Sequence, residues 1–144
     1  KIIQSMSNST TLTQATTQLH TQPFSKLLNA EVAELGEDKV ALRVPITEQV
    51  LQQHGFVHGG VVSYAADNAL TYAGFLSLKQ NVVTSEFKIN YVRPAKGETL
   101  MARAYTVHAG KNQAVCRCDV FCVQDGREVL CAVAQGTIVV MLPK

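Results

Sequence analysis

The chain has 144 residues, of which 47% are hydrophobic and 17% are charged, and its formal net charge is +2. A chain of this length forms one domain that buries about two-thirds of its unfolded surface. The small net charge and the scattered basic residues argue against nucleic-acid binding. The first residues also lack the apolar region and cleavage pattern of a secretory signal. We therefore expect a compact cytoplasmic protein with some apolar surface left for a partner subunit.

The first third of the chain predicts short elements. Residues 7–22 are mostly polar, and we expect them to be loose or weakly helical. Residues 23–28 begin with a proline and fit a short helix. Residues 30–35 and 39–44 flank a Gly-Glu-Asp sequence, which is the pattern of a β-hairpin.

The segment 59–78 is apolar except for a few small polar residues and one carboxylate, Asp67. This composition predicts a helix that is buried on nearly every side. Ser63, Asp67 and Thr71 recur every four positions and therefore share one face of that helix. Because an unpaired carboxylate in a protein core is energetically costly, Asp67 indicates either bonded partners or a chemical task.

Two glycines, Gly59 and Gly60, open this helix. Glycine lets a ligand approach the backbone closely. The first N–H groups of a helix have no intrahelical acceptor and lie at its positive end. The segment therefore has the features of one half of a catalytic site.

Residues 82–92 alternate in polarity, which predicts a half-buried strand. The face expected to meet the helix holds Val83, Ser85, Phe87, Ile89 and Tyr91, and the opposite face holds Thr84, Glu86, Lys88 and Asn90. Further strands are expected at residues 99–108, 113–124 and 128–141, with an Asp-Gly hairpin signal before the last. A buried helix followed by a meander of long strands predicts an α+β fold in which the sheet wraps around the helix.

Four cysteines occur at positions 116, 118, 122 and 131. Strand alternation places the first three on one face. Their spacing, with no histidine or further cysteine nearby, is unfavourable for a zinc site. We interpret them as small buried residues of a cytosolic protein and expect no metal.

Gln52, the sequence His58-Gly59-Gly60 and Asp67 form a specific set, with an amide six residues before the histidine and an acid nine residues after it. This set resembles the hotdog-fold acyl-CoA thioesterases, in their phenylacetate-pathway-like and 4-hydroxybenzoyl-CoA-thioesterase-like branch. The family uses Asn or Gln at the first position and Asp or Glu at the last.

Further positions match the same family. Thr71 supplies a hydroxyl one helical turn after the acid, and Ser85 supplies one on the following strand. Residues 91–95 and 109–111 also look like family segments. The resemblance covers roughly residues 25–142.

The resemblance implies a hotdog fold, a long central helix wrapped by an antiparallel sheet of about five or six strands. We expect a single hotdog thioesterase domain at residues 25–144, preceded by a polar N-terminal tail at residues 1–24. Met6 is a candidate natural start within that tail.

The implied activity is hydrolysis of an acyl- or aryl-CoA thioester to a free acid and CoA. The Gly59 N–H would polarise the thioester carbonyl and stabilise its developing negative charge. Gln52 would orient the thioester or the attacking water. Asp67 would act either as general base on water or as nucleophile, and the sequence does not separate these roles.

Two hydroxyls and one histidine complete the expected chemistry. Thr71 would hold the water, and Ser85 would assist near Asp67. Because a serine is unusual among large apolar neighbours, Ser85 has either this role or a plain hydrogen bond to backbone. His58 has two readings as well, a base or, as we favour, a ring that fixes the loop before the helix.

The CoA phosphates require cations and backbone donors near the mouth of the site. The resemblance implies Arg93, Lys96 and Lys111 for this role, together with His58 and Gly60 at the thioester end. Each lysine or arginine is alternatively an ordinary surface charge. No cofactor is expected, since CoA enters as part of the substrate.

Helix geometry predicts a dimer. Gly59 and Asp67 lie eight residues apart, or about 12 Å along a helix, so one thioester carbon cannot contact both in one chain. Two antiparallel helices across a two-fold axis would bring Gly59 of one subunit to Asp67 of the other. The resemblance also implies further pairing of dimers into tetramers.

Other functions remain open at this point. The same fold can serve as a non-catalytic acyl-CoA-binding module, although binding alone would not require the acid, the amide and both hydroxyls together. It can also serve as a dehydratase or hydratase, but this sequence lacks the family pattern of a histidine paired with an acid. The acyl group is not determined either. Phe56, Tyr64, Tyr72 and Phe75 could line its pocket or belong to the core.

Overall fold

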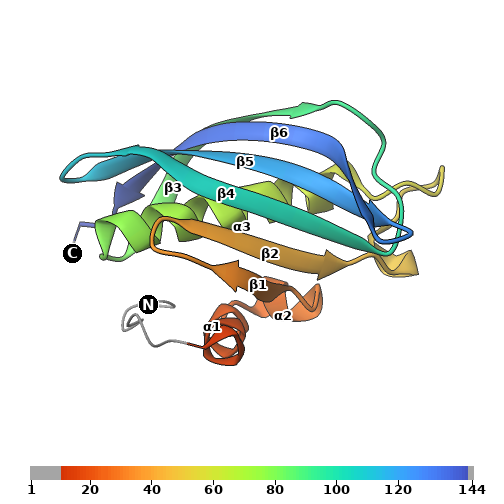
Figure 1. Cartoon of the computed structure of the whole chain (residues 1–144), viewed down its shortest axis with the longest axis horizontal. Helices are drawn as coiled ribbons and strands as arrows, with labels where there is room; N and C mark the ends of the chain where they lie inside the picture. Colours follow the sequence, from red (N-terminus) through yellow and green to blue (C-terminus); the bar gives the residue numbers. More distant parts are fainter. Residues whose placement is uncertain (1–10, 143–144) are drawn as a thin grey trace.

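One long helix, α3 (Gly59–Leu78), lies at the centre of the molecule, and an antiparallel sheet curves around it (Figure 1). The computed structural model describes residues 11–142. The sheet has six strands in the order β1-β2-β4-β5-β6-β3. These strands are β1 (Glu31–Leu35), β2 (Lys39–Pro45), β3 (Val82–Tyr91), β4 (Thr99–Ala109), β5 (Gln113–Gln124) and β6 (Arg127–Val140). The predicted α+β hotdog architecture is confirmed.

Small side chains let α3 pack closely against the sheet. Ala65, Ala69 and Ala73 are fully buried along the helix. At Gly74 an added Cβ would come within 2.6 Å of the Ile138 side chain on β6. Lys79 caps the C-terminus of the helix in a left-handed conformation, with φ of 57°. The predicted burial of this apolar segment is therefore correct, and its small residues set the distance between helix and sheet.

The turns and cysteines follow the sequence prediction. Asp125 and Gly126 join β5 to β6 with φ values of 50° and 78°, as expected for an Asp-Gly hairpin. The cysteines are unpaired and buried, and Cys116, Cys118 and Cys122 point from β5 toward the core.

The register of β3 differs from the predicted alternation. A β-bulge lies between Thr84 and Glu86 in the pairing of β3 with β6. It moves Thr84 to the helix-facing side and leaves Ser85 exposed, while Phe87 and Ile89 keep the expected inward orientation. The predicted inward position of Ser85 is therefore wrong, because one extra residue reverses the alternation on the N-terminal side of the bulge.

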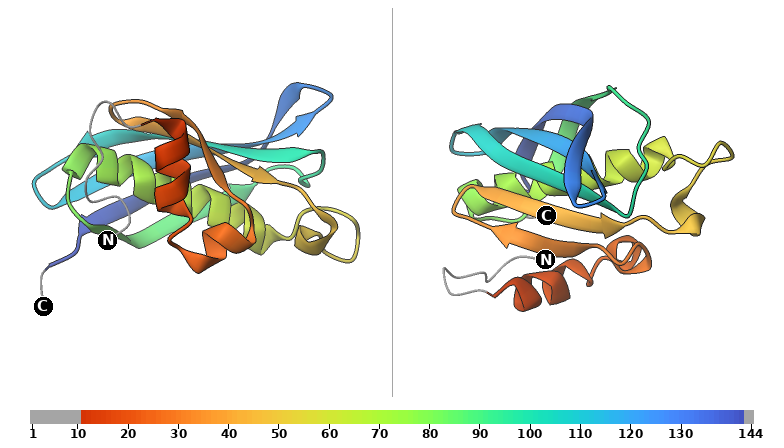
Figure 2. Two further views of the ribbon diagram at one scale, coloured as in Figure 1. Left: turned by 90° about the horizontal axis from the view of Figure 1, so that it is seen from below. Right: turned by 45° about the vertical axis from the view of Figure 1, so that its right-hand side comes forward.

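The N-terminal segment joins the core. Helix α1 (Leu12–Leu19) begins with a capping box between Thr11 and Gln14 and buries Ala15 and Leu19. The Val32 N–H on β1 donates to Thr16 Oγ1 at 2.9 Å. Figure 2 shows α1 beside β1, together with the short helix α2 (Pro23–Leu27). Residues 12–19, expected to be loose or weakly helical, thus form a packed helix. Residues 1–10, including Met6, lie outside the described part.

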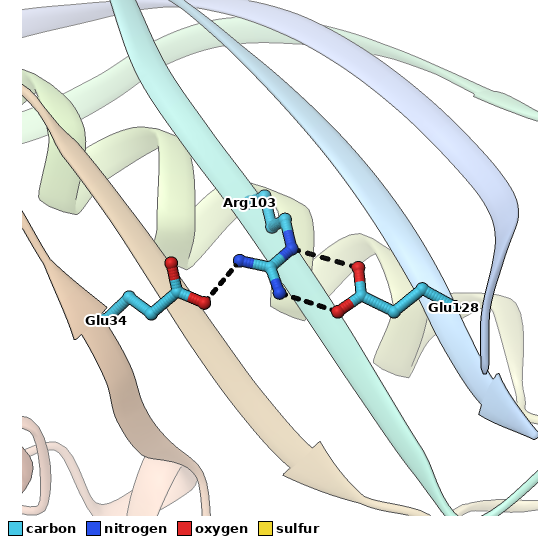
Figure 3. Close-up of polar contacts among 3 residues, drawn as sticks. All are labelled: Glu34, Arg103 and Glu128. Carbon is cyan, nitrogen blue, oxygen red and sulfur yellow. Dashed lines mark hydrogen bonds and ion pairs between the residues drawn. The ribbon is translucent and has the colours of Figure 1, made fainter. Parts of the chain in front are cut away.

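Arg103 links three strands of the sheet (Figure 3). Its guanidinium donates to both carboxylate oxygens of Glu128, at 3.0 and 2.6 Å, and to Glu34 at 2.6 Å. The hydrogen bonds from Arg103 hold the pKa of the Glu128 carboxyl below its usual value, against the opposing effect of burial. Because both side chains are about one-third exposed, solvent screening keeps the contribution of this pair to stability small.

Glu128→Gln is expected to lower the free energy of unfolding by less than about 1 kcal/mol near neutral pH. A depressed carboxyl pKa stabilises the folded state above the unfolded pKa of about 4.3, and this contribution is lost as the pH falls through the folded pKa. The difference between wild type and variant, measured by urea unfolding at fixed protein concentration, should therefore shrink toward about pH 3. Glu37→Gln is the control, because Glu37 is exposed and forms no ion pair among residues 11–142. A difference that is constant with pH would contradict this account.

Candidate active site

The N-terminus of α3 opens into a cavity. His58 caps the helix, with its Nδ1 accepting from the Gly60 N–H at 2.9 Å. The Gly59 N–H has no acceptor among residues 11–142. A cavity of about 360 Å³ lies beside it, lined by Gln52, Phe56, Val57, Gly59, Val62, Tyr91, Val92, Arg93, Pro94, Ala95 and Cys131. A free N–H at the positive end of a helix is suited to bind a carbonyl oxygen that gains negative charge.

The hydrogen bond of the helix cap determines the tautomer of the neutral His58 ring. Since Nδ1 accepts a hydrogen bond, the neutral ring carries its proton on Nε2. The imidazole thereby fixes the start of the helix, which agrees with the structural role favoured from the sequence.

Gln52 reaches the same cavity from the loop before α3. This loop follows the short helix η1 (Glu48–Val50) and closes on itself, with the Gln52 N–H donating to the Phe56 carbonyl at 2.8 Å. Gln52 Oε1 accepts from the His54 N–H. Within the described residues 11–142 the Gln52 Nε2 has no acceptor, and Gln52 and Gly59 both line this cavity.

Asp67 lies eight residues beyond Gly59 on α3 and contacts two threonines. Thr84 Oγ1 on β3 donates to Asp67 Oδ1 at 2.6 Å. Thr71 Oγ1 lies 2.7 Å from Thr84 Oγ1 and 2.8 Å from the Asp67 carbonyl. Because the single Thr84 proton goes to the carboxylate, Thr71 shares its proton between these two acceptors. The arrangement fixes Oδ1 by one bond, and Oδ2 has no hydrogen-bond partner among the described residues 11–142.

Thr84 was missed from the sequence, which placed it on the outer face and Ser85 beside Asp67. The alternation predicted for residues 82–92 comes from residues 86–91, whereas residues 82–85 (Val-Val-Thr-Ser) are two apolar and then two hydroxyl residues. Extending the alternation back to Thr84 and Ser85 therefore had no support from their own polarity. A second missed residue is Tyr91, whose hydroxyl contacts both Gly59 and Ser63. Ser63 lies on the same helix face as Asp67 and Thr71. The four-residue spacing of these three polar residues was the sequence signal for a polar partner on this face.

The expected CoA-binding cations occupy two separate places. Arg93 lines the cavity and donates from Nη1 to the Leu130 carbonyl at 2.6 Å. Lys96 is exposed a few residues further on. Lys111 lies in the turn between β4 and β5, at the opposite end of the sheet (Figure 1). One chain therefore brings Arg93 to the Gly59 cavity but leaves Lys111 distant from it.

The four aromatic residues considered for the acyl pocket lie in different places. Phe56 lines the cavity, whereas Tyr72 and Phe75 are buried in the core. The Tyr64 hydroxyl donates to Ser25 Oγ at 2.6 Å and accepts from Asn68 at 2.9 Å. Burial raises the pKa of Tyr64, and these two hydrogen bonds partly oppose the shift. Tyr64 therefore connects α3 to α2 through a network of side-chain hydrogen bonds.

A single chain does not bring Gly59 and Asp67 together. Gly59 is hydrogen-bonded to Tyr91 at the C-terminal end of β3. Asp67 is hydrogen-bonded to Thr84, near the N-terminal end of the same strand. Among residues 11–142 no group of His, Cys, Asp and Glu side chains could hold a metal ion. No helix in the same range is long and apolar enough to cross a bilayer.

Comparisons with known proteins agree with this geometry. The Thioesterase superfamily matches residues 54–129, more than half of the chain. The structure of a thioesterase family protein from Silicibacter pomeroyi has a TM-score of 0.82 and 33% identity, covering 88% of this chain and 95% of that one. A thioesterase from Haemophilus influenzae gives a TM-score of 0.81 and 28% identity, covering 93% and 92%.

Sequence similarity extends to the acyl-coenzyme A thioesterase PaaI of Escherichia coli. The two sequences are 33% identical over 92 residues, which are 63% of this chain and 65% of that protein. The fold, the glycine-opened central helix and these matches together confirm the resemblance, and the chain belongs to the hotdog-fold thioesterase superfamily of thioester hydrolases.

Proposed function

We propose that this protein hydrolyses an acyl- or aryl-CoA thioester to a free acid and CoA, at sites built from two subunits. The observation that supports this most is the separation of two complementary groups. At one end of β3, Gly59 lines a cavity and its N–H has no acceptor in the described part of the chain, and a hydroxyl-bonded Asp67 lies near the other end.

Strand β3 supplies the route to assembly. In the sheet formed by residues 11–142 it is an edge strand that pairs only with β6, and it extends over ten residues. A long unpaired edge is a template for another strand. Antiparallel pairing of two copies of β3 about a two-fold axis near the strand centre sets the Thr84 end of one opposite the Tyr91 end of the other. Asp67 of one subunit then approaches Gly59 of its partner. Further pairing into tetramers is part of the same proposal.

The chemistry follows from the groups at each end. The Gly59 N–H binds the thioester oxygen and stabilises the tetrahedral charge, with Gln52 orienting the thioester or the water. Asp67 acts as general base on water or as nucleophile, and CoA leaves as the thiol. Thr84 and Thr71 hold Asp67 in place. Ser85, exposed next to Thr84, is proposed to assist from the same bulge.

Binding of CoA uses the cations around this assembly. Arg93 lines the Gly59 cavity, and Lys96 directly follows Ala95, another lining residue. His58 and Gly60, which flank Gly59, are proposed to bind at the thioester end. Lys111 lies near the N-terminal end of β3 and would reach the same CoA from the other subunit. The unpaired buried cysteines support a cytoplasmic location, where thiols stay reduced.

Asp67→Asn keeps the size of the side chain and its bond from Thr84 but removes the base or nucleophile. Turnover is expected to fall at least about a hundredfold, while binding of acyl-CoA persists. The measurement is steady-state hydrolysis over short, medium, long and aromatic acyl-CoAs, with an enzyme-only blank because the cysteines can react with the thiol reagent. Tight acyl-CoA binding without hydrolysis of any member by the wild type would instead support a non-catalytic acyl-CoA-binding module.

Thr84→Val and Ser85→Ala separate the two hydroxyls at the bulge. Thr84→Val removes the bond to Asp67 Oδ1 with little change of shape, and turnover should fall about ten- to a hundredfold. Thr84→Ser should retain most of the activity, because it keeps the hydroxyl. Ser85→Ala should reduce turnover less than Thr84→Val does. The reverse order, measured with the best substrate of the panel, would show that Ser85 rather than Thr84 supports the acid.

Mixed oligomers test the composite site. Gly59→Pro removes the N–H at the first helical position, where proline fits and where His58, with ψ of 133°, already has the conformation favoured before proline. Gly59→Ala is the control, because it keeps the N–H and its Cβ would lie 3.4 Å from the Tyr91 hydroxyl.

Gly59→Pro and Asp67→Asn should each be inactive alone. Statistical subunit exchange between them should restore about a quarter of the wild-type activity, since half of the dimers are mixed and each has one intact site. Activity that stays at the level of the parents after exchange would mean that each site lies within one chain.

A further inference from the structure

Tyr91 binds the backbone of the residue that carries the proposed oxyanion donor. Its hydroxyl donates to the Gly59 carbonyl at 3.0 Å and lies 2.6 Å from Ser63 Oγ. Because the tyrosine has one proton and gives it to Gly59, Ser63 must donate to Tyr91. The result is a directed chain of hydrogen bonds from Ser63 through Tyr91 to the Gly59 carbonyl.

With this series of hydrogen bonds, both peptide planes that flank Gly59 are held in place. The preceding plane is held by the His58 carbonyl, which accepts from the Val61 N–H at 2.9 Å. The following plane is held at its N–H by His58 Nδ1, at 2.9 Å, and at its carbonyl by Tyr91. Glycine is the residue with the most backbone freedom, so an N–H at this position keeps a fixed direction only if its neighbouring planes are bonded.

Burial does not explain the position of Tyr91. The residue is 54% exposed in the single chain, so its orientation rests on its two hydrogen bonds rather than on packing in the core. It lines the same cavity as Gly59, at the end of the edge strand β3. Its hydroxyl contacts the first turn of α3 at Gly59 and Ser63.

We propose that Tyr91, oriented by Ser63, is a positioning residue that preorganises the Gly59 N–H for the thioester oxygen. The inference rests on the proposed thioester hydrolysis at this site. A donor that is already aimed before the reaction stabilises the transition state without reorganisation, so its loss affects turnover more than substrate binding.

Tyr91→Phe keeps the ring and removes the hydroxyl. With the best acyl-CoA of the panel, kcat should fall about tenfold while KM changes by less than about twofold. Ser63→Ala should lower kcat by about threefold, and the double variant should resemble Tyr91→Phe alone, because both residues act through one bond. Tyr105→Phe is the matched control, since Tyr105 is 46% exposed on β4 and its hydroxyl has no hydrogen-bond partner within residues 11–142. It should leave both constants unchanged.

A second measurement reads the backbone directly. The ¹³C shift of the Gly59 carbonyl should move in Tyr91→Phe. A ketone analogue of acyl-CoA, with a methylene group between sulfur and carbonyl, should shift the Gly59 N–H resonance less in this variant than in wild type.

These readings separate the two proposals. If wild type hydrolyses no acyl-CoA, the proposed function fails, and an equal response of the Gly59 N–H to the ketone analogue in wild type and Tyr91→Phe would overturn the positioning role as well. If wild type is active and Tyr91→Phe retains its kcat, Tyr91 is merely structural and the inference is wrong.

Discussion

The hydrogen bond from Thr84 to Asp67 is the interaction on which the rest of the site depends. It places a carboxylate within a helix that is otherwise apolar, where an unsatisfied charge would oppose folding. The bond exists because a bulge in β3 turns Thr84 toward α3. The same bulge leaves Ser85 exposed beside it. One local irregularity of the edge strand therefore determines which hydroxyl meets the acid and which faces outward.

The helix and the edge strand support both ends of the site in the same way. At the Asp67 end, Thr71 from α3 and Thr84 from β3 share hydrogen bonds. At the Gly59 end, Ser63 from α3 and Tyr91 from β3 do the same. In each pair, the strand residue contacts the functional group and the helix residue orients the strand residue.

This arrangement would couple the proposed chemistry to the proposed assembly. Because β3 runs antiparallel to α3, its two ends lie beside the two functional groups, and its free edge is available for a second copy. In the proposed dimer, a two-fold axis at the middle of β3 would exchange those ends. The strand would then form the subunit interface while its inner face holds Asp67 and Gly59 in position. A substitution on β3 can consequently alter activity through the interface, through the positioning bonds, or through both.

The sequence by itself determined the order of the elements, the α+β class and the identity of the central helix, because apolar composition and periodicity depend on local spacing alone. It also selected Gln52, Gly59 and Asp67, through a motif whose members lie close along the chain. Only the tertiary structure decided which residues support them. Thr84 and Tyr91 reach α3 from a strand that follows it, and the polarity of residues 82–85 gives no sign of the bulge that orients Thr84. Such contacts depend on strand register and on the distance between sheet and helix, which packing across the whole domain establishes.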